Sequence, residues 1–383
     1  MRILLSLIGN TIGSTGGVEK VLCNMANAMV ERGHEVTIFA FENKAGEPFF
    51  CLDKRVRFLN LGLGFKISHT VFNLSTFWMD RNNKELKRLL HDAKIIANRV
   101  EKEIKAVNAD IVVTYEKLSD VMFKEYLKLD IPVVTMFHFN YDDVLKNRKL
   151  YYLFEKSDYL QVLTHNDLIE TQKLIKKPKI VWIPNVAPQF EERAALNIKT
   201  IINIARVEPK QKRQHLLIEA FAKVANKYPD WKVEIYGDTG FNKKYYSECC
   251  QLIEKHNLQN RVFFCGTTKD VKAKLLNSAI FAFPSAYEGF GIALAEALSA
   301  GVPAIGYASC PGTNEVILNG ESGILCDDGV DAFAVALDSL MGNEALRQKM
   351  GIAAKESMEQ YAPDKVWSTW ESLLEEAVSS KAQ

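Results

Sequence analysis

The chain has 383 residues, 48% of them hydrophobic and 25% charged, with a formal net charge of +1. This composition excludes a disordered or collagen-like chain, and the length predicts two domains of about 180 residues each. The first 190 residues hold 27 Lys+Arg and 22 Asp+Glu and the rest hold 21 and 25, so the halves carry +5 and −4. A bias this small excludes a nucleic-acid-binding domain and fits an anionic acceptor or membrane surface.

The opening segment MRILLSLIGN has one basic residue and a short apolar run. It predicts a buried first strand, because a signal peptide or a membrane span needs a longer apolar stretch. The seven cysteines include no C-x-x-C pair. Scattered cysteines without metal-ligand spacing are typical of reduced thiols in a cytoplasmic protein.

Short apolar runs alternate with helical stretches along the chain. The predicted strands form a first series at residues 3–8, 35–40, 110–115, 132–137 and 159–163, and a second at 180–183, 199–205, 231–236, 262–265, 280–284 and 303–306. Helices are predicted at 19–32, 84–107, 214–228, 243–256, 271–277 and 293–300. Continuous Val/Ile/Phe runs indicate strands buried on both faces, so this βαβ alternation predicts doubly wound parallel sheets of the α/β class.

The pattern breaks at residues 184–197, PNVAPQFEERAALN, which has two prolines and little periodicity. We therefore predict a Rossmann-like domain over 1–185, a linker over 186–197 and a second Rossmann-like domain over 198–362, with the two domains facing each other across a cleft.

The predicted helix 84–107 is amphipathic, with a leucine-rich apolar stripe and a basic opposite face. Two interpretations stay open. The helix packs its stripe on a Rossmann sheet, which we favour because acidic residues interrupt the basic face, or it contacts a membrane surface or a lipid acceptor.

The strongest motif is EGFGIALAE, residues 288–296, directly after the predicted strand 280–284. Gly289 and Gly291 stand where a strand turns into a helix, and backbone amides without a neighbouring Cβ can approach a phosphate closely. Glu288 and Glu296 can each accept two hydroxyl hydrogen bonds from a sugar or ribose. The alternative is an ordinary glycine turn with two surface glutamates.

A second motif, RVEPKQK, follows the predicted strand 199–205. Ligands bind at the carboxyl ends of parallel strands, and Arg206 and Lys212 there can neutralise a departing diphosphate. Taken alone, this motif would be better explained as a solvated basic loop.

Two weaker signals lie in the first half. The loop GSTGGVEK contains Gly16 and Gly17 and opens a helix, but it lacks both the dinucleotide G-x-G-x-x-G spacing and the ATP-binding G-x-x-x-x-G-K-[ST] pattern. His138 ends the predicted strand 132–137, where it can orient an acceptor hydroxyl, although a single histidine is more often structural.

Together these motifs resemble glycosyltransferase family 4, the large retaining family with the two-domain GT-B fold. The resemblance covers nearly the whole chain and rests on Glu288 and Glu296, Arg206 and Lys212, Gly16-Gly17-Val18-Glu19, His138, Ile183-Pro184-Asn185 and Val262-Phe263-Phe264-Cys265-Gly266. Two departures stand out. The Arg–Lys spacing is six residues where five is more usual, which makes Lys210 a rival to Lys212, and Thr114-Tyr115-Glu116 lacks the histidine often found at that strand end.

The resemblance implies a role for each matched residue. Arg206 and Lys212 would hold the diphosphate and Glu288 would contact the donor sugar. The donor-binding set, in which Glu296 holds the ribose, is Gly16, Gly17, Gly237, Gly289, Phe290, Gly291, Ile292 and Glu296. Gly16, Gly17 and His138 would also line the acceptor side.

The resemblance further implies a retaining, metal-independent enzyme with no cofactor, whose helix at 363–383 returns to the first domain. The donor would be a nucleotide-diphospho-sugar, with UDP favoured by family frequency. The acceptor would be a glycan, lipid-linked by preference, used in surface polysaccharide synthesis at the cytoplasmic side, with peripheral contact to an anionic membrane surface and none to nucleic acid. A nucleotide-sugar 2-epimerase with a similar architecture is the main alternative. An NAD-dependent oxidoreductase and an inactive regulatory domain are disfavoured by the missing fingerprint and by the intact Arg206, Lys212 and Glu288.

Overall fold

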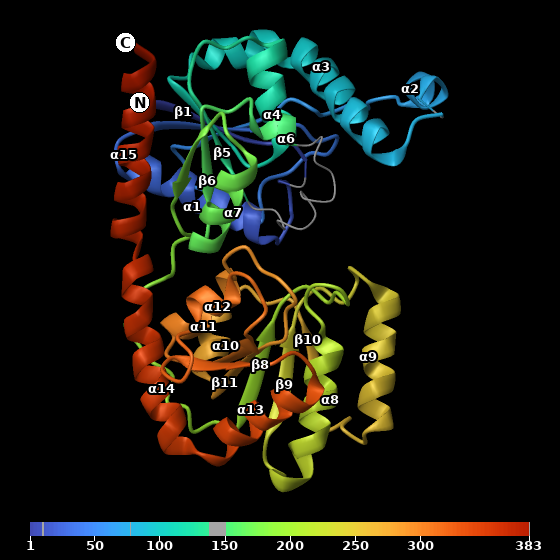
Figure 1. Cartoon of the computed structure of the whole chain (residues 1–383), viewed down its shortest axis with the longest axis vertical. Coiled ribbons are helices and arrows are strands. Elements are labelled where there is room, and N and C mark those ends of the chain that lie inside the picture. Colours follow the sequence, from blue (N-terminus) through green and yellow to red (C-terminus); the bar gives the residue numbers. More distant parts are fainter. Residues whose placement is uncertain (10, 77, 138–150, 383) are drawn as a thin grey trace. The chain divides into compact units, whose positions relative to one another are not determined.

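The computed structural model describes residues 1–9, 11–76, 78–137 and 151–382 (Figure 1). The chain forms two compact units. Unit 1 comprises Met1–Pro184 and Val366–Gln383, and unit 2 comprises Asn185–Lys365. Each unit is built on one parallel sheet, so the predicted α/β class with two Rossmann-like sheets is confirmed.

Unit 1 contains a seven-stranded sheet in the order β3-β2-β1-β4-β5-β6-β7. Its strands are β1 (Arg2–Leu7), β2 (Glu35–Ala40), β3 (Arg57–Asn60), β4 (Ile111–Thr114), β5 (Val133–Met136), β6 (Tyr159–Val162) and β7 (Lys179–Trp182). All neighbouring strands pair in parallel, and Leu4 of β1 lies between Thr37 and Val112. The central strands are buried along their length because helices cover both faces.

The helices of unit 1 include one that is far longer than the strands it accompanies. They are α1 (Gly17–Glu31), α2 (Thr70–Ser75), α3 (Arg81–Val107), α4 (Lys117–Val121), a π-helical turn (Met122–Tyr126), α6 (Tyr151–Phe154), α7 (His165–Leu174) and α15 (Pro363–Ala382). The carboxyl-terminal half of α3 buries Ala93, Ile96 and Val100 in the core. The other end of α3 carries α2 away from the sheet (Figure 1). The interpretation that the apolar stripe packs on the sheet therefore holds for the carboxyl-terminal half of α3.

From Val366 onward, α15 packs within unit 1. Trp370, on this helix, is buried. Glu371 lies 2.9 Å from His34 Nε2, Glu376 lies 2.5 Å from Lys179 Nζ, and Lys381 lies 2.9 Å from Asp130. The helix is thus attached to unit 1 by an apolar face and by ion pairs along its length.

Unit 2 contains a six-stranded parallel sheet in the order β10-β9-β8-β11-β12-β13. Its strands are β8 (Thr200–Ile204), β9 (Lys232–Tyr236), β10 (Val262–Gly266), β11 (Ile280–Phe283), β12 (Ala304–Tyr307) and β13 (Gly323–Cys326). Its helices are α8 (Gln214–Val224), α9 (Lys243–Lys255), α10 (Val271–Leu276), α11 (Ile292–Ser299), α12 (Thr313–Val316), α13 (Val330–Gly342) and α14 (Glu344–Ser357), with 3-10 turns at Ala225–Lys227 and Met358–Tyr361.

Three strands differ from the sequence prediction. The run at 180–183, which we placed in the second series, is β7 and pairs with β6 in the first sheet. A buried apolar run has the same sequence pattern in either sheet. Only its position before the linker indicates that it belongs to the first sheet. The edge strands β3 and β13 were not predicted, because each is four residues long and largely half-buried.

Both sheets reverse their strand order beside the first strand. In unit 2, β8 lies between β9 and β11, and in unit 1, β1 lies between β2 and β4. The loops after β8 and β11 therefore leave the sheet side by side at its carboxyl edge, which is where open α/β sheets bind ligands. Among the described residues, no helix is long and apolar enough to cross a membrane.

Candidate functional site

The loops after β8 and β11 bring together a lysine and a glutamate that are 76 residues apart in the sequence. Lys212 Nζ lies 2.5 Å from Glu288 Oε1, and their side chains are 12% and 7% exposed. A salt bridge this deeply buried must offset the desolvation of both charges, so neither partner can be removed without leaving an uncompensated charge. The switch point of unit 2 thus contains a buried ion pair.

Arg213 and Gln211 hold the two loops in place. Arg213 occupies the left-handed region, with φ of 49°, at the start of α8, and its guanidinium donates to the carbonyls of Pro284 and Ser285 at 2.9 Å each. Gln211 accepts from the Ala286 N–H at 2.7 Å and donates through Nε2 to the Tyr287 carbonyl at 3.1 Å. Neither residue is recognisable from the sequence, because the roles of both depend on the backbone path of the loop.

Arg206 and Lys210 are exposed on the same loop. The guanidinium of Arg206 lies over the ring of Phe241, with 5.1 Å from its central carbon to the ring centroid, and it donates weakly to Gln211 at 3.4 Å. The Lys210 N–H donates to Glu208 at 3.0 Å. Of the two rival lysines, Lys212 is the one that contacts Glu288.

The glycine turn of the EGFG motif leads into α11, which begins at Ile292. Gly291 has φ of 77°, and a Cβ there would lie 3.4 Å from the side chains of Phe283 and Leu294. The ring of Phe290 packs edge-on against Tyr361 at 5.0 Å, so only its backbone is available to a ligand. The first turn of α11 contains no acidic residue, and its N–H groups therefore remain suited to an anion.

Glu296, in the middle of α11, is 8% exposed. Gly237 follows β9 and donates to the Gly266 carbonyl at 2.8 Å. A Cβ on Gly237 would lie only 1.9 Å from the Ala205 carbonyl oxygen, and this close approach of two backbones requires glycine. A Cβ on Gly312 would meet the carbonyl oxygens of Glu288 and Gly289 at 2.6 and 2.7 Å, so Gly312 lets the loop after β12 press against the EGFG turn.

Cys310, in that same loop, is fully buried and lies 3.1 Å from the Thr313 hydroxyl. Burial raises the pKa of its thiol to about 12, and the nearby charge of Glu288 adds to the shift. The thiol therefore stays protonated and cannot act as a nucleophile at neutral pH.

In unit 1, Gly16 precedes α1 and Gly17 is its first residue. The carboxylate of Glu19 folds back against Gly16, where it accepts from the Ser14 hydroxyl at 2.9 Å and is 9% exposed. A carboxylate at this helix end already occupies the position that an anion would take. Gly16 and Gly17 therefore lie beside a carboxylate that accepts hydrogen bonds from hydroxyl groups, and not beside an open phosphate site. His138 lies outside the described residues.

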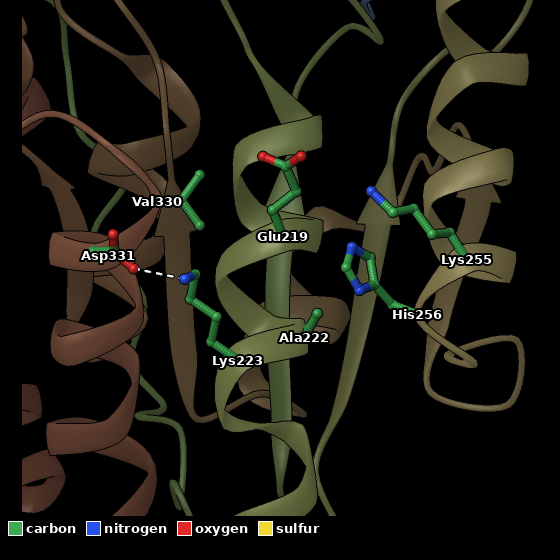
Figure 2. A pocket seen from close by; sticks show the side chains of 7 residues that line it. All are labelled: Glu219, Ala222, Lys223, Lys255, His256, Val330 and Asp331. Atoms are coloured by element: carbon green, nitrogen blue, oxygen red, sulfur yellow. Dashed lines mark ion pairs between the residues drawn. The ribbon is translucent and has the colours of Figure 1, made fainter.

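A surface recess in unit 2 lies apart from these loops, between α8, α9 and the start of α13 (Figure 2). It is lined by Glu219, Ala222, Lys223, Lys255, His256, Val330 and Asp331. In Figure 2, Lys223 points toward Asp331, and these two side chains form an ion pair at 2.7 Å. The recess contains none of the residues that the motifs predict, and its charges already neutralise one another.

Residues 188–357, which include both loops of the site, match the family described as Glycosyl transferases group 1. Residues 15–187 match the family described as Glycosyltransferase Family 4. The chain belongs to these glycosyltransferases. It is therefore a transferase of the hexosyltransferase type, and unit 2 corresponds to the group 1 region.

Relatives with curated names agree with this glycosyltransferase assignment over the full length. An uncharacterized glycosyltransferase of Haemophilus influenzae is 23% identical over 95% of this chain and 97% of its own. The N-acetyl-alpha-D-glucosaminyl L-malate synthase of Bacillus anthracis is 26% identical over 94% of each chain. A solved structure of TarM from S. aureus with Fondaparinux, alpha-GlcNAc-glycerol and UDP has a TM-score of 0.76 at 15% identity and covers 97% of this chain and 99% of that one. The last likeness shows the GT-B fold.

Proposed function

We propose that the protein is a retaining glycosyltransferase that moves a hexose or N-acetylhexosamine from a nucleotide-diphospho-sugar, with UDP as the nucleotide, to a glycan acceptor. The observation that carries the proposal is the buried Lys212–Glu288 pair, placed beside the uncapped start of α11 at the switch point of unit 2. The UDP in the TarM complex supports this choice of nucleotide.

The chemical task of such a site is to stabilise the charge that develops on the leaving diphosphate. Lys212 supplies a point charge in a dehydrated environment, Arg206 supplies an exposed guanidinium, and the first N–H groups of α11 supply fixed dipoles. Preorganised donors of this kind are worth about 3–4 kcal/mol each in a site that excludes water.

Donor binding exchanges the partners of the ion pair. When the diphosphate takes Lys212, the carboxylate of Glu288 loses its cation and gains the sugar hydroxyls as donors instead. Glu296, in the helix α11 that follows this loop, holds the ribose in this proposal. The exchange means that the ligand-free ion pair keeps the pocket electrically neutral until the donor arrives.

The configuration at the anomeric carbon is retained because the acceptor attacks the same face of the sugar from which the diphosphate leaves. The bond from the anomeric carbon to the phosphate oxygen breaks, the acceptor oxygen bonds to that carbon, and the acceptor proton moves to the departing phosphate. No protein nucleophile is needed, and Cys310, the thiol beside Glu288, is held protonated by burial. We propose that lysine, arginine and backbone dipoles do the work of a metal in this step.

We place the acceptor on unit 1, with Gly16, Gly17 and His138 on its side. The acceptor we propose is a lipid-linked glycan at the cytoplasmic face of the membrane, approached by the basic face of α3. The exposed residues of that helix include Lys87, Arg88, Lys94, Arg99, Lys102 and Lys105. The name of the Bacillus anthracis relative contains L-malate, so malate is the first small acceptor to test beside a lipid-linked glycan.

Donor turnover in loop variants tests the proposal. Lys212→Ala and Arg206→Ala are each expected to lower turnover of UDP-sugars by about 100-fold or more, because each removes charge from the leaving diphosphate. Lys210→Ala is the matched control on the same loop and should stay within about twofold of the wild type. Near-normal turnover in Lys212→Ala would remove the diphosphate assignment.

Two further measurements separate the alternatives. An epimerase consumes a nucleotide-sugar without any acceptor and returns its 2-epimer, whereas this protein should release UDP in proportion to acceptor glycosylated. Turnover should persist in EDTA, and a complete loss restored only by added metal would contradict the metal-free mechanism.

A further inference from the structure

Two imidazoles and a carboxylate converge in unit 1, in a part of the chain that the proposed chemistry does not use. His69 immediately precedes α2, while His91 and Asp92 belong to α3. His69 Nε2 lies 2.7 Å and His91 Nδ1 lies 3.3 Å from the same oxygen, Asp92 Oδ1. All three atoms lie within 4.8 Å of one another, so two ring nitrogens and one carboxylate oxygen are close enough to bind one metal ion.

The spacing of these atoms fits a tetrahedral metal ion. Zinc bonds imidazole nitrogen and carboxylate oxygen at about 2.0–2.2 Å, which sets ligand atoms about 3.3 Å apart. The separations of 2.7, 3.3 and at most 4.8 Å bracket that value. Three protein ligands leave the fourth position to water, as zinc commonly allows.

The surroundings are partly dehydrated. The side chains of His69, His91 and Asp92 are 32%, 34% and 15% exposed. The ring of Phe72, which is 8% exposed, lies against both imidazoles, with centroids 6.4 and 5.1 Å away. An apolar wall on one side lowers the local dielectric and strengthens any charge interaction at the site.

The donor set selects the class of metal. Two nitrogens and one oxygen suit zinc and neighbouring transition ions, whereas Mg²⁺ and Ca²⁺ prefer oxygen ligands throughout. We propose that His69, His91 and Asp92 form a Zn²⁺ site that fastens the start of α2 onto α3. This metal would join α2 to α3 and is separate from the diphosphate chemistry of unit 2.

The local fold explains what such a site would do. The helix α2 has only six residues, too few to be stable through its own hydrogen bonds. It lies at the end of α3 that extends beyond the sheet (Figure 1). A metal that joins residue 69 to residues 91 and 92 closes a loop of about 20 residues and orders this segment.

Calorimetry with Zn²⁺ alone and the visible absorption of bound Co²⁺ test the site in the full chain after EDTA treatment and dialysis. We expect one ion per chain, with tetrahedral Co²⁺ bands. Asp92→Asn and His69→Ala should each weaken binding by about 100-fold or more, since loss of a ligand exceeds the usual effect of losing an outer partner. His256→Ala, at a half-buried histidine that follows α9 in unit 2, is the control and should bind as the wild type does.

Hydrogen exchange measures whether bound Zn²⁺ orders the α2 segment. Zn²⁺ should slow exchange of the amides at 67–80 in the wild type and not in Asp92→Asn, with His91→Ala as the second variant if circular dichroism shows that Asp92→Asn is unfolded. The proposal is overturned by absence of binding, by binding that the ligand variants leave unchanged, or by binding without protection of 67–80. UDP-induced thermal stabilisation should be the same in His69→Ala and wild type, so this test is independent of the donor site.

Discussion

Two glycine turns open helices at the switch points of the two sheets, and they differ in what occupies the helix end. At α11 in unit 2 the first turn contains no acidic residue, and Glu288 beside it is paired with Lys212. At α1 in unit 1 the carboxylate of Glu19 folds over Gly16. A glycine turn before a helix therefore indicates an anion site only when no carboxylate of the protein already occupies it.

The largest expected effect separates binding from turnover at the α11 turn. Glu288→Ala should lower turnover by about 100- to 1000-fold, because the donor sugar loses its carboxylate. The same change frees Lys212, so UDP should bind at least as tightly as it does to the wild type. Steady-state rates and calorimetry with UDP measure the two quantities. Weaker UDP binding in Glu288→Ala would show that Lys212 is not the diphosphate ligand.

Alanine at the two turns tests the geometry of the comparison. Gly291→Ala places a side chain at φ of 77°, within 3.4 Å of Phe283 and Leu294. The left-handed conformation costs about 1–2 kcal/mol, or a fall of roughly 2–8 °C in Tm, and UDP affinity should fall with it.

Gly16→Ala is the counterpart, with φ of −73° and only the mobile end of Glu19 in the way. Its Tm should change by less than that of Gly291→Ala, and UDP affinity should not change. Equal losses of UDP affinity in both variants would contradict the assignment of the diphosphate to unit 2. Differential scanning fluorimetry with and without UDP distinguishes these outcomes.

The sequence predicted the elements of the site better than their contacts. The motif glutamate at 288 and the lysine at 212 were each assigned to the donor, but their pairing follows from loop closure by Arg213, whose left-handed backbone has no sequence signal. The mismatch at β7 has a similar cause, since a short apolar run does not identify its sheet. Glu19 belongs to a glycine-loop motif in the sequence, and only the three-dimensional structure shows that its carboxylate covers the helix end.

Buried carboxyl groups also distinguish the units. Glu288 has a lysine partner, whereas burial raises the pKa of Asp120 in unit 1 well above its ordinary value of 3.8, although hydrogen bonds from Thr114 and Thr135 lower it. Nearby Glu116 raises the pKa further and Lys124 lowers it. The folded state thus binds a proton that the unfolded chain releases above about pH 4.

Because of that proton, Asp120 should make the wild type less stable as the pH rises from about 4 through the raised pKa of the folded state. Asp120→Asn mimics the neutral form, so its Tm relative to the wild type should increase with pH. Thermal unfolding between about pH 5 and pH 8 measures the difference. A Tm difference that is constant over this range would mean that the carboxyl group does not stay protonated on folding.

The smallest expected effect concerns the carboxylate at α1. Glu19→Gln keeps an acceptor for the Ser14 hydroxyl and removes the negative charge from the helix end. If unit 1 binds the glycan acceptor and not the diphosphate, UDP affinity should change by less than about twofold. The KM for the glycan should rise, because its hydroxyl groups lose a charged hydrogen-bond partner. Substantially tighter UDP binding in Glu19→Gln would mean that the N–H groups of α1 lie within reach of the diphosphate, and that the protein's own carboxylate had been competing with it.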